Sequence, residues 1–280
     1  MEILEQFFDP GTGTAGQLFW GSLVCIALWE ALRPLRPLEH SVLVRWINNI
    51  ALAVLNGGII KILTVLLAFD LVLLADRSGF GLLNVVELPV WLALSLGVAW
   101  LDFVSYATHR LSHAVPIFWR IHRLHHSDPD VDFSTSRRHH PFETFITTPI
   151  LVAGLLVSGA PPLALLIWSA LSGTLSLFQH GNIRLPDALD RGLRLVLVTP
   201  AMHRTHHSSK RSETDSNYGQ VFPWWDRMLG TYCARPEGGL TGMTLGLEHF
   251  RHRDELFLHR LLLQPFAATK TTPVRQTEIS

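Results

Sequence analysis

The sequence predicts an all-α integral membrane protein with four or five membrane helices, including a hairpin, and a helical cap on the cytoplasmic side. Of the 280 residues, 48% are hydrophobic and only 16% are charged, whereas a soluble domain carries about 25% charged residues. Charged residues are depleted from long apolar blocks, and eleven of the 15 histidines gather in short clusters near the ends of those blocks. A soluble all-α domain with buried helices is the alternative interpretation of the same blocks.

Two apolar blocks lie in the N-terminal part of the chain. Residues 16–32 are apolar almost throughout, and their number suits a membrane span of about 20 residues. The second block, residues 47–75, is interrupted by Asn56-Gly57-Gly58 and also carries Lys61 and Asp70. It therefore predicts either one tilted span or an interfacial turn followed by a span.

Two further blocks lie in the middle of the chain. Residues 89–108 form the third block, which ends directly at His109. The fourth, residues 145–178, is split by Gly159-Ala160-Pro161-Pro162, and this run of turn residues predicts a tight helical hairpin. Both arms of the hairpin are expected to be short for a full crossing.

The charge distribution predicts the orientation of the spans. An excess of Lys and Arg marks the cytoplasmic side of a membrane protein. The N-terminal residues are acidic and lack a basic region, so we expect no cleavable signal peptide. The loop after the first block carries three arginines and one glutamate: Arg33, Arg36, Arg45 and Glu39. The N-terminus should therefore face outward, and counting the spans onward places every histidine cluster on the cytoplasmic side.

The remaining chain is expected to form the cap. Residues 110–142, and the chain from residue 185 onward, are polar enough to lie outside the membrane. Residues 247–266 mix basic and large apolar side chains, which predicts an amphipathic helix on the membrane surface. We expect residues 1–268 to form a single domain and residues 269–280 a disordered tail.

Charge and cysteine content exclude several function classes. The formal net charge is zero, so nothing favours nucleic acid as a partner. Cys25 and Cys233 are the only cysteines, and two distant thiols cannot hold a zinc ribbon or an iron–sulfur cluster.

The histidine clusters predict a two-metal site. Residues three and four apart share one face of a helix, so His122, His125 and His126 are expected to aim at a single point. The same holds for the triad His203, His206 and His207, while His109 and His113 add a four-residue pair. Imidazole is the usual ligand for iron, zinc, copper and nickel, and this many exceeds what one ion binds. The isolated histidines have no expected metal role: His40, His249, His252 and His259.

Longer motifs around the histidines resemble the fatty acid hydroxylase/sterol desaturase superfamily of membrane-bound di-iron enzymes. The chain lacks the His-Glu-x-x-His of zinc peptidases and the Glu-x-x-His pairs of soluble di-iron proteins. The resemblance covers residues 99–232 and is carried by WRIHRLHHS (119–127), RHHPFE (138–143), TPAMH (199–203), ETDSNYG (213–219) and WDRMLGTY (225–232). It implies an oxygen-dependent hydroxylase or desaturase that uses two iron ions to attack a C–H bond of a sterol, fatty acid or related lipid.

The resemblance also implies a ligand set. The matching histidines are His109, His113, His122, His125, His126, His203, His206 and His207, with His180 at the position of the family's isolated histidine. His140 matches the histidine before proline and is either a ligand or a partner of one. His139 falls at a variable position and is not expected to take part.

Polar partners for the imidazoles are expected as well. Metal-bound imidazoles usually donate their other N–H to a carboxylate or carbonyl. Asp102 lies two helical turns before His109 on the same face, and a charge within a span is costly unless it has a partner. The alternative interpretation of Asp102 is a charged side chain that lies near the membrane surface. Further candidates are Glu143, Asn182 and Asp215.

The electron source is expected to be external, because no Gly-rich dinucleotide fingerprint is present. An external reductase, a ferredoxin, a cytochrome b5-like carrier and a reduced pterin remain open. A membrane metal transporter or metal-binding protein is the alternative function, but its ligands should lie within the spans, whereas these histidines follow span ends. The expected location is a bacterial inner membrane.

Overall fold

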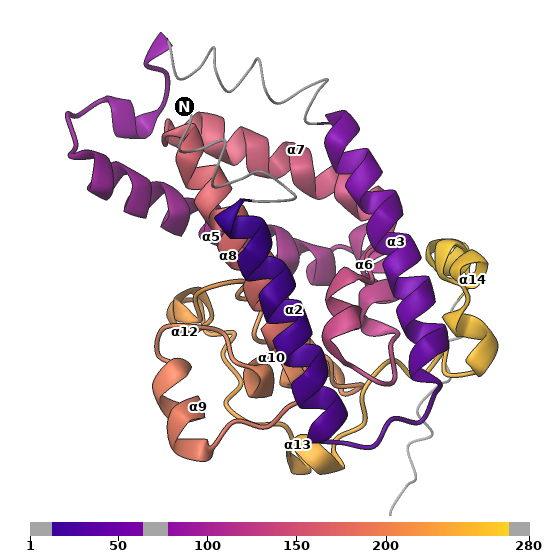
Figure 1. Ribbon diagram of the computed structural model, residues 1–280. Helices are drawn as coiled ribbons and strands as arrows, with labels where there is room; N and C mark the ends of the chain where they lie inside the picture. Colours follow the sequence, from indigo (N-terminus) through magenta and orange to yellow (C-terminus); the bar gives the residue numbers. More distant parts are fainter. Residues whose placement is uncertain (1–12, 64–77, 269–280) are drawn as a thin grey trace, which may run out of the picture.

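The computed structural model describes residues 13–63 and 78–268, and over these residues the chain is helical, with one isolated β-bridge between Ser208 and Leu245 (Figure 1). In this part of the chain, five helices are long and apolar enough to cross a membrane, which indicates an integral membrane protein. They are α2 (Thr14–Leu32), α3 (Val42–Leu63), α5 (Val90–Ala114), α7 (Pro141–Ser158) and α8 (Pro162–His180). The predicted all-α fold is confirmed for the described residues, and the five candidate spans agree with the higher of the two predicted numbers.

The surface of the first spans is apolar, as a lipid-facing surface requires. On α2, Leu18, Trp20 and Leu28 are exposed, and on α3 Ile47 and Val54 are exposed. Helix α2 packs against α8, and α3 packs against α7. A helix that is apolar all round suits a membrane span, so the exposed side chains fit contact with lipid.

Helix α3 continues without interruption through Asn56-Gly57-Gly58, so of the two alternatives for the second block, the one with a turn at these residues is wrong. The Asn56 amide explains why. Its Nδ2 donates to the carbonyls of Leu52 (3.0 Å) and His139 (2.8 Å), and its Oδ1 accepts from Thr144 (2.6 Å). The asparagine is therefore fully bonded and ties α3 to the start of α7. Asp70, and the rest of the second apolar block, lie outside the described residues.

Helix α5 is longer than the apolar block that predicted it. It continues past His109 and His113 to Ala114 and ends at Val115, whose backbone is extended. Because a residue before proline disfavours the helical conformation, Pro116 sets this end. Proline then opens the next helix, α6 (Pro116–His126).

Helices α7 and α8 form the predicted hairpin. Gly159 adopts a left-handed conformation (φ 65°) and its N–H donates to the carbonyl of Leu155, which ends α7 as glycine commonly does. Pro162 then begins α8. The arms contain 18 and 19 residues, so the expectation that both are too short for a crossing is wrong.

The cap consists of short helices that join the ends of the spans. It contains α6, η3 (Phe133–Arg137), α9 (Asp187–Leu193), α10 (Pro200–His206), α11 (Arg211–Thr214), α12 (Trp224–Met228) and α13 (Gly239–Gly242). Glu30, at the end of α2, accepts from the N–H groups of Asn182 (2.6 Å) and Phe133 (2.9 Å). Arg45, at the start of α3, forms buried ion pairs with Asp128 (2.9 Å) and Asp132 (2.7 Å).

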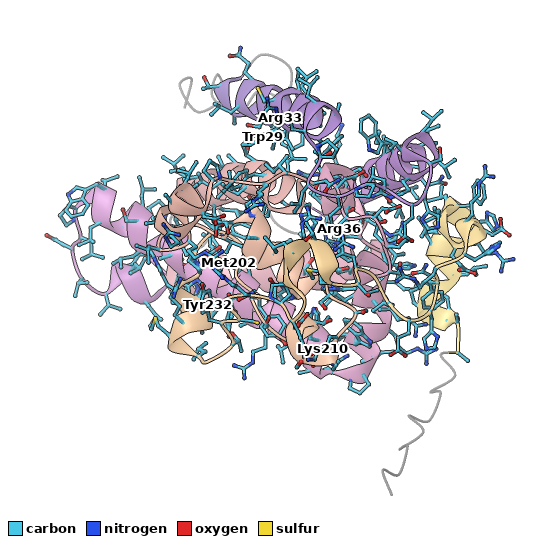
Figure 2. All side chains as sticks on the ribbon, turned by 90° about the horizontal axis from the view of Figure 1, so that it is seen from below. Trp29, Arg33, Arg36, Met202, Lys210 and Tyr232 are labelled. Atoms are coloured by element: carbon cyan, nitrogen blue, oxygen red, sulfur yellow. The ribbon has the colours of Figure 1, made fainter. Side chains whose placement is uncertain are left out.

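The loop between α2 and α3 lies on the cap. Seen from the cap side, Arg36 lies close to α13 (Figure 2), and its Nη1 donates to the carbonyls of Leu240 (3.2 Å) and Met243 (2.6 Å). The cap therefore gathers the end of α2, the start of α3, the end of α5, the start of α7 and the end of α8 on one side of the molecule.

The segment 247–266 is not one amphipathic helix, so that prediction is wrong. It forms η4 (Arg253–Leu256), α14 (Leu258–Leu263) and η5 (Gln264–Phe266), separated by the extended residue Phe257 and limited by Pro265. Leu261 is fully buried against Leu52 of α3 and Leu124 of α6. Leu256 of this segment is also buried, whereas Leu263 and Phe266 are exposed. The predicted tail lies outside the described residues.

Candidate metal centre

Nine histidines from α5, α6, α8, α10 and the residue directly after α10 come together where the spans meet the cap. They form two groups, within each of which one nitrogen per ring lies within 4.8 Å of the others. The first group contains His109, His113, His122, His126 and His206, and the second contains His125, His180, His203 and His207. These are the nine histidines that the sequence singled out as ligands.

Each triad is divided between the two groups, so the expectation that a triad aims at a single point is wrong. On α6, His122 and His126 belong to the first group and His125 to the second. On α10 the division is reversed, because His203 and His207 belong to the second group and His206 to the first. Successive residues of a helix are rotated by about 100°, so two neighbouring imidazoles point to different places.

Ring nitrogens within each group are spaced like ligands of one ion. In the first group, Nε2 of His109 lies 3.1 Å from Nε2 of both His122 and His206. In the second group, Nε2 of His180 lies 3.1 Å from that of His125 and 2.9 Å from that of His203. Imidazole nitrogens lie about 2.0–2.1 Å from an ion such as zinc, and neighbouring ligands at that radius are separated by about 3 Å.

The hydrogen bonds of Nδ1 set the tautomers. Nδ1 of His109 lies 2.9 Å from the carbonyl of Tyr218, and Nδ1 of His206 lies 2.7 Å from that of Ser216. A carbonyl only accepts, so both Nδ1 atoms carry the hydrogen and both Nε2 atoms present lone pairs. Two lone pairs 3.1 Å apart repel each other unless a cation lies between them. This arrangement fits a bound metal.

Burial keeps the imidazoles neutral. Burial, reinforced by neighbouring imidazoles, holds the pKa of His125, His126, His203 and His207 well below the ordinary value for histidine. Nε2 of His113 is buried and has no hydrogen-bond partner. Neutral imidazoles with free ring nitrogens are the form that binds transition metals, so the donors fit two such ions.

Carboxylates orient two imidazoles of the first group. Glu143 Oε1 accepts from Nδ1 of His122 at 2.8 Å, and Asp215 Oδ1 lies 3.2 Å from Nδ1 of His113. Both carboxylates were expected partners, and both lie beside ligand candidates. In the second group, Nδ1 of His180 donates to the carbonyl of Ser176 (2.8 Å), one turn earlier in the same helix.

Substitution of Glu143 with glutamine is expected to weaken metal binding in the first group by about 10–100-fold, since partners of ligating imidazoles contribute about that much to affinity. The glutamine side chain has the same shape, so the melting temperature should change little. Titration of the protein with Fe²⁺ against a competing chelator measures the affinity. An unchanged affinity would show that Glu143 does not support the His122 imidazole.

Asp102 does not contact any of the nine histidines. It is fully buried and accepts hydrogen bonds from the indoles of Trp168 (3.2 Å) and Trp225 (2.9 Å) and from the N–H groups of Val221 (2.9 Å) and Phe222 (3.0 Å). All four of these donors lie outside the two histidine groups, so the hydrogen bonds of Asp102 do not orient His109. Asp102 instead attaches α5 to α8 and to the segment before α12.

Asn182 is also structural. Its side chain exchanges hydrogen bonds with the backbone of Arg36, accepting at 3.2 Å and donating at 2.8 Å. It holds the loop after α2 on the cap and contacts none of the nine histidines.

His140 lies outside both groups and begins α7. Its Nδ1 accepts from the N–H of Phe142 (3.1 Å), and its Nε2 donates to the carbonyl of Leu262 (3.2 Å). Both ring nitrogens are thus used, and neither faces the centre.

Replacement of His140 with alanine is expected to leave the metal content unchanged and to reduce stability by about 1 kcal/mol, the usual effect of losing a helix cap. Metal analysis and thermal unfolding of the purified variant check both parts. Loss of metal at unchanged stability would return His140 to the ligand set.

His139, which was not expected to take part, lies beside the two groups. Its ring stacks on His125 with centroids 4.4 Å apart and an interplanar angle of 12°, and its Nδ1 lies 3.1 Å from Glu143 Oε1. Together with His122 and Glu143 it forms a third cluster of possible ligands. The four-residue spacing of His139 and Glu143 was the feature of the sequence that could have predicted this contact.

A cavity of about 530 Å³ opens between the spans above the histidines. His109, His122, His125, His180 and His203 form one part of its wall. The rest of the wall comes from α3, α5, α7 and α8, with the apolar Ile60, Leu151 and Trp168 among the lining residues, and from α2, η3 and neighbouring residues of the cap. The cavity therefore connects the candidate metal centre with the interior of the span bundle.

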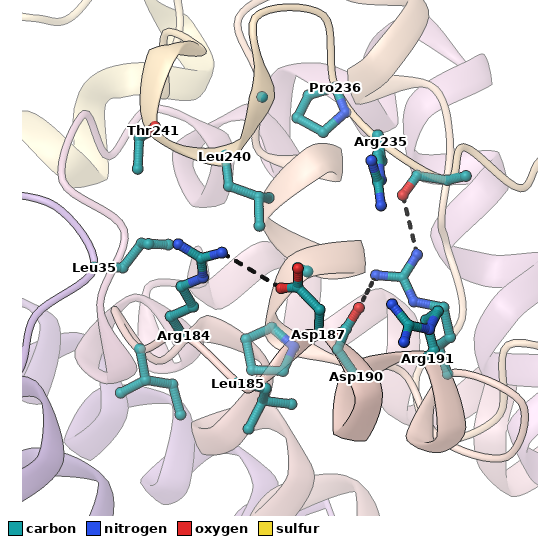
Figure 3. A pocket seen from close by; sticks show the side chains of 16 residues that line it. Leu35, Arg184, Leu185, Asp187, Asp190, Arg191, Arg235, Pro236, Leu240 and Thr241 are labelled. Carbon is teal, nitrogen blue, oxygen red and sulfur yellow. Dashed lines mark hydrogen bonds and ion pairs between the residues drawn. The ribbon is translucent and has the colours of Figure 1, made fainter.

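A second cavity of about 460 Å³ lies in the cap (Figure 3). None of the nine histidines lines it. Its wall contains Arg184 paired with Asp187 (3.4 Å), Arg194 paired with Asp190, and the exposed Arg191. This cavity is separate from the one above the histidines.

The family model and the relatives that match this chain are all named as hydroxylases or monooxygenases. Residues 94–231 match the family model described as fatty acid hydroxylase. The chain is 32% identical over 154 residues to an ornithine lipid hydroxylase, OlsE, of Rhizobium tropici, and 31% identical over 170 residues to the alkylglycerol monooxygenase of Homo sapiens. It is 28% identical over 216 residues to the fatty acid hydroxylase vlmA of a Lecanicillium species.

These similarities cover parts of each protein. They span 55%, 60% and 71% of this chain, and 45%, 36% and 57% of the respective relatives. The matched region thus amounts to less than half of the first two relatives. No solved structure matches the chain significantly.

Proposed function

Because the chain belongs to the fatty acid hydroxylase/sterol desaturase superfamily, we propose that it is an oxygen-dependent di-iron hydroxylase or desaturase acting on a lipid. The observation that carries the proposal is that histidines of both groups lie at the wall of the cavity between the spans. Five histidines of the two groups line that cavity, so a lipid chain within it lies beside both groups.

We assign the nine histidines of the two groups as the iron ligands. When bound there, two iron ions would supply the oxidising chemistry, using O2 and electrons from an external donor to attack an unactivated C–H bond. The donor set alone also suits zinc, copper or nickel, and the choice of iron rests on the family.

The protein's own contribution is orientation. The carbonyls of Tyr218 and Ser216 hold His109 and His206 in one tautomer, and Glu143 does the same for His122. Because these partners are fixed by the fold, the lone pairs face the centre before any ligand binds. Such preorganisation reduces the cost of assembling the site.

The cavity supplies a route for an apolar substrate. Helices α3 and α7 both run from the cap into the membrane part of the protein. Along α3 the lining changes from Asn56 to Ile60, and along α7 it changes from Glu143 to Leu151. A lipid can therefore reach the histidines from the bilayer while its apolar part stays out of water.

We further propose that the cap faces the cytoplasm of a bacterial cell. The arginines of the loop after α2 support this side, because Lys and Arg concentrate in cytoplasmic loops. A soluble electron donor would then reach the cap directly.

The test is metal analysis combined with product analysis. Protein expressed with iron-57 and purified in detergent is expected to contain about two irons per chain, as two-metal oxygenases do, with a Mössbauer spectrum that changes from ferrous to coupled ferric on exposure to O2. Incubation with membrane lipids, a reductant and ¹⁸O₂ should give a labelled lipid alcohol, or an alkene without label.

An isolated histidine provides the control. The variant His249→Ala should keep both the iron and the activity. Stoichiometric zinc that persists after iron reconstitution, without any lipid product, would reject the oxygenase and favour a metal-binding protein or transporter.

A further inference from the structure

The side chain of Arg137 reaches into the substrate cavity. Arg137 is the last residue of η3 and lines the cavity together with the histidines. Its Nη2 donates to the carbonyl of Gly173 in α8 (2.9 Å), and its guanidinium carbon lies 4.9 Å from the centre of the Phe19 ring of α2. The fold thus holds this cation between two spans, at the wall of the cavity.

This cation lacks a negatively charged partner among the described residues. Its Nε is buried without a hydrogen bond, and burial alone lowers the pKa of the guanidinium, with no carboxylate opposing it. Arg45, by contrast, is buried against two aspartates. Arg137 as a whole is half-buried, with its guanidinium at the wall of the cavity. A guanidinium held largely out of bulk water without a counter-charge is costly, which indicates that a ligand supplies the missing charge.

The other polar groups that line the cavity do not neutralise Arg137, so its charge is available to an anion. Glu143 is the only carboxylate among the described lining residues, and its Oε1 is engaged by His122 and His139. The lining also includes hydroxyl groups that can donate hydrogen bonds: Ser105, Thr147, Thr148 and Ser176. The part of the cavity near the histidines is therefore polar, and its apolar part, at Ile60 and Leu151, lies farther into the spans.

Arg137 and the second histidine group lie at different heights along α8. Gly173, which accepts from Arg137, precedes His180 by seven residues, which corresponds to about 10 Å along a helix axis. An anionic group at Arg137 is thus held about 10 Å along α8 from His180, and the C–H bonds that reach the histidines belong to carbons within roughly that distance of the charged end.

We propose that Arg137 forms an anion-binding site in the substrate cavity and that the substrate is a lipid with a carboxylate or phosphate group close to the reacting carbons. This inference rests on the proposed function, because it places a substrate in the cavity above the histidines. Arginine suits the role because its planar donors match carboxylate and phosphate oxygens.

The experiment compares matched lipids that differ in charge. Binding to the purified full-length protein in nanodiscs is measured at pH 8 without an electron donor, so that no turnover occurs. The probes are palmitate against hexadecanol, and dioleoyl phosphatidate against dioleoylglycerol. In at least one pair the anion should bind about ten-fold more tightly or better, as a hydrogen bond to a charged group predicts. The pair that shows the preference identifies the anion as carboxylate or phosphate.

Variants test whether Arg137 causes the preference for the anionic lipid. Arg137→Gln, whose amide can still donate to Gly173, should lose it, and Arg137→Lys should retain part of it. Arg191→Gln, in the separate cap cavity, should keep it in full. The proposal is overturned if neither pair shows a preference in the wild-type protein, a measurement that does not depend on how the variants fold, or if folded Arg137→Gln keeps the preference.

The outcomes separate this site from the enzyme function. Iron-dependent lipid hydroxylation without a charge preference would reject the anion site alone. A charge preference that depends on Arg137, in a protein that produces no oxidised lipid, would support the site and reject the oxygenase.

Discussion

Replacement of His180 with alanine is expected to lower the iron content from about two ions per chain to about one, and to abolish lipid oxidation, because the chemistry of a two-metal site needs both ions. His180 lies between His125 (3.1 Å) and His203 (2.9 Å) in the second group, which has four imidazoles against five in the first. Loss of one of four ligands should therefore affect the second ion far more than the first. Iron analysis and product formation measure the two effects.

The control for this variant is His259→Ala, an isolated histidine outside both groups, which should retain iron and activity. If His180→Ala keeps both ions and full turnover, the histidine is not a ligand. Loss of both ions would show that the groups do not fill independently.

Replacement of Asp102 with alanine is expected to prevent stable folding. The carboxylate accepts four hydrogen bonds in a fully buried position, including those from the indoles of Trp168 and Trp225. Each donor left without a partner costs about 1–3 kcal/mol, so the sum is comparable with the whole stability of a domain, about 5–15 kcal/mol. Fluorescence-detected size-exclusion chromatography and thermal unfolding report the loss.

Ser95→Ala on the same helix is the matched control. Its side chain is exposed and its hydroxyl bonds to the Trp91 carbonyl of its own helix (2.8 Å), so the free energy of unfolding should stay within about 0.5 kcal/mol of the wild-type value. A folded Asp102→Ala protein that has lost iron would contradict the structural role and reinstate the carboxylate as a partner of the metal ligands.

The apolar blocks predicted the spans well because membrane insertion depends on composition and length, which are local properties. The failures share a cause. The turn at Asn56, one of the two alternatives for the second block, and the surface helix at residues 247–266 were both wrong because contacts with distant residues decide the structure there. Asn56, for example, is tolerated within α3 because Thr144 and the His139 carbonyl satisfy its amide.

The candidate ligands could be predicted from spacing and family resemblance, since all nine histidines come together. Their division into groups could not, because it depends on how α6 and α10 face each other. The partners were harder still. Tyr218 and Ser216 contribute backbone carbonyls, which leave no trace in the type of side chain, and Asp102 finds its donors more than 60 residues away in the sequence.

The crosswise division of the two triads has a consequence for the evolution of this centre. Both groups depend on the same two short helices, α6 and α10. Insertion or deletion of one residue in either helix rotates all following side chains by about 100° and misplaces ligands of both groups together. A change of register in α6 or α10 therefore cannot remove one candidate metal site and preserve the other. A one-metal descendant would have to arise through changes in α5 or α8, each of which supplies ligands to one group alone, or through substitution of individual histidines.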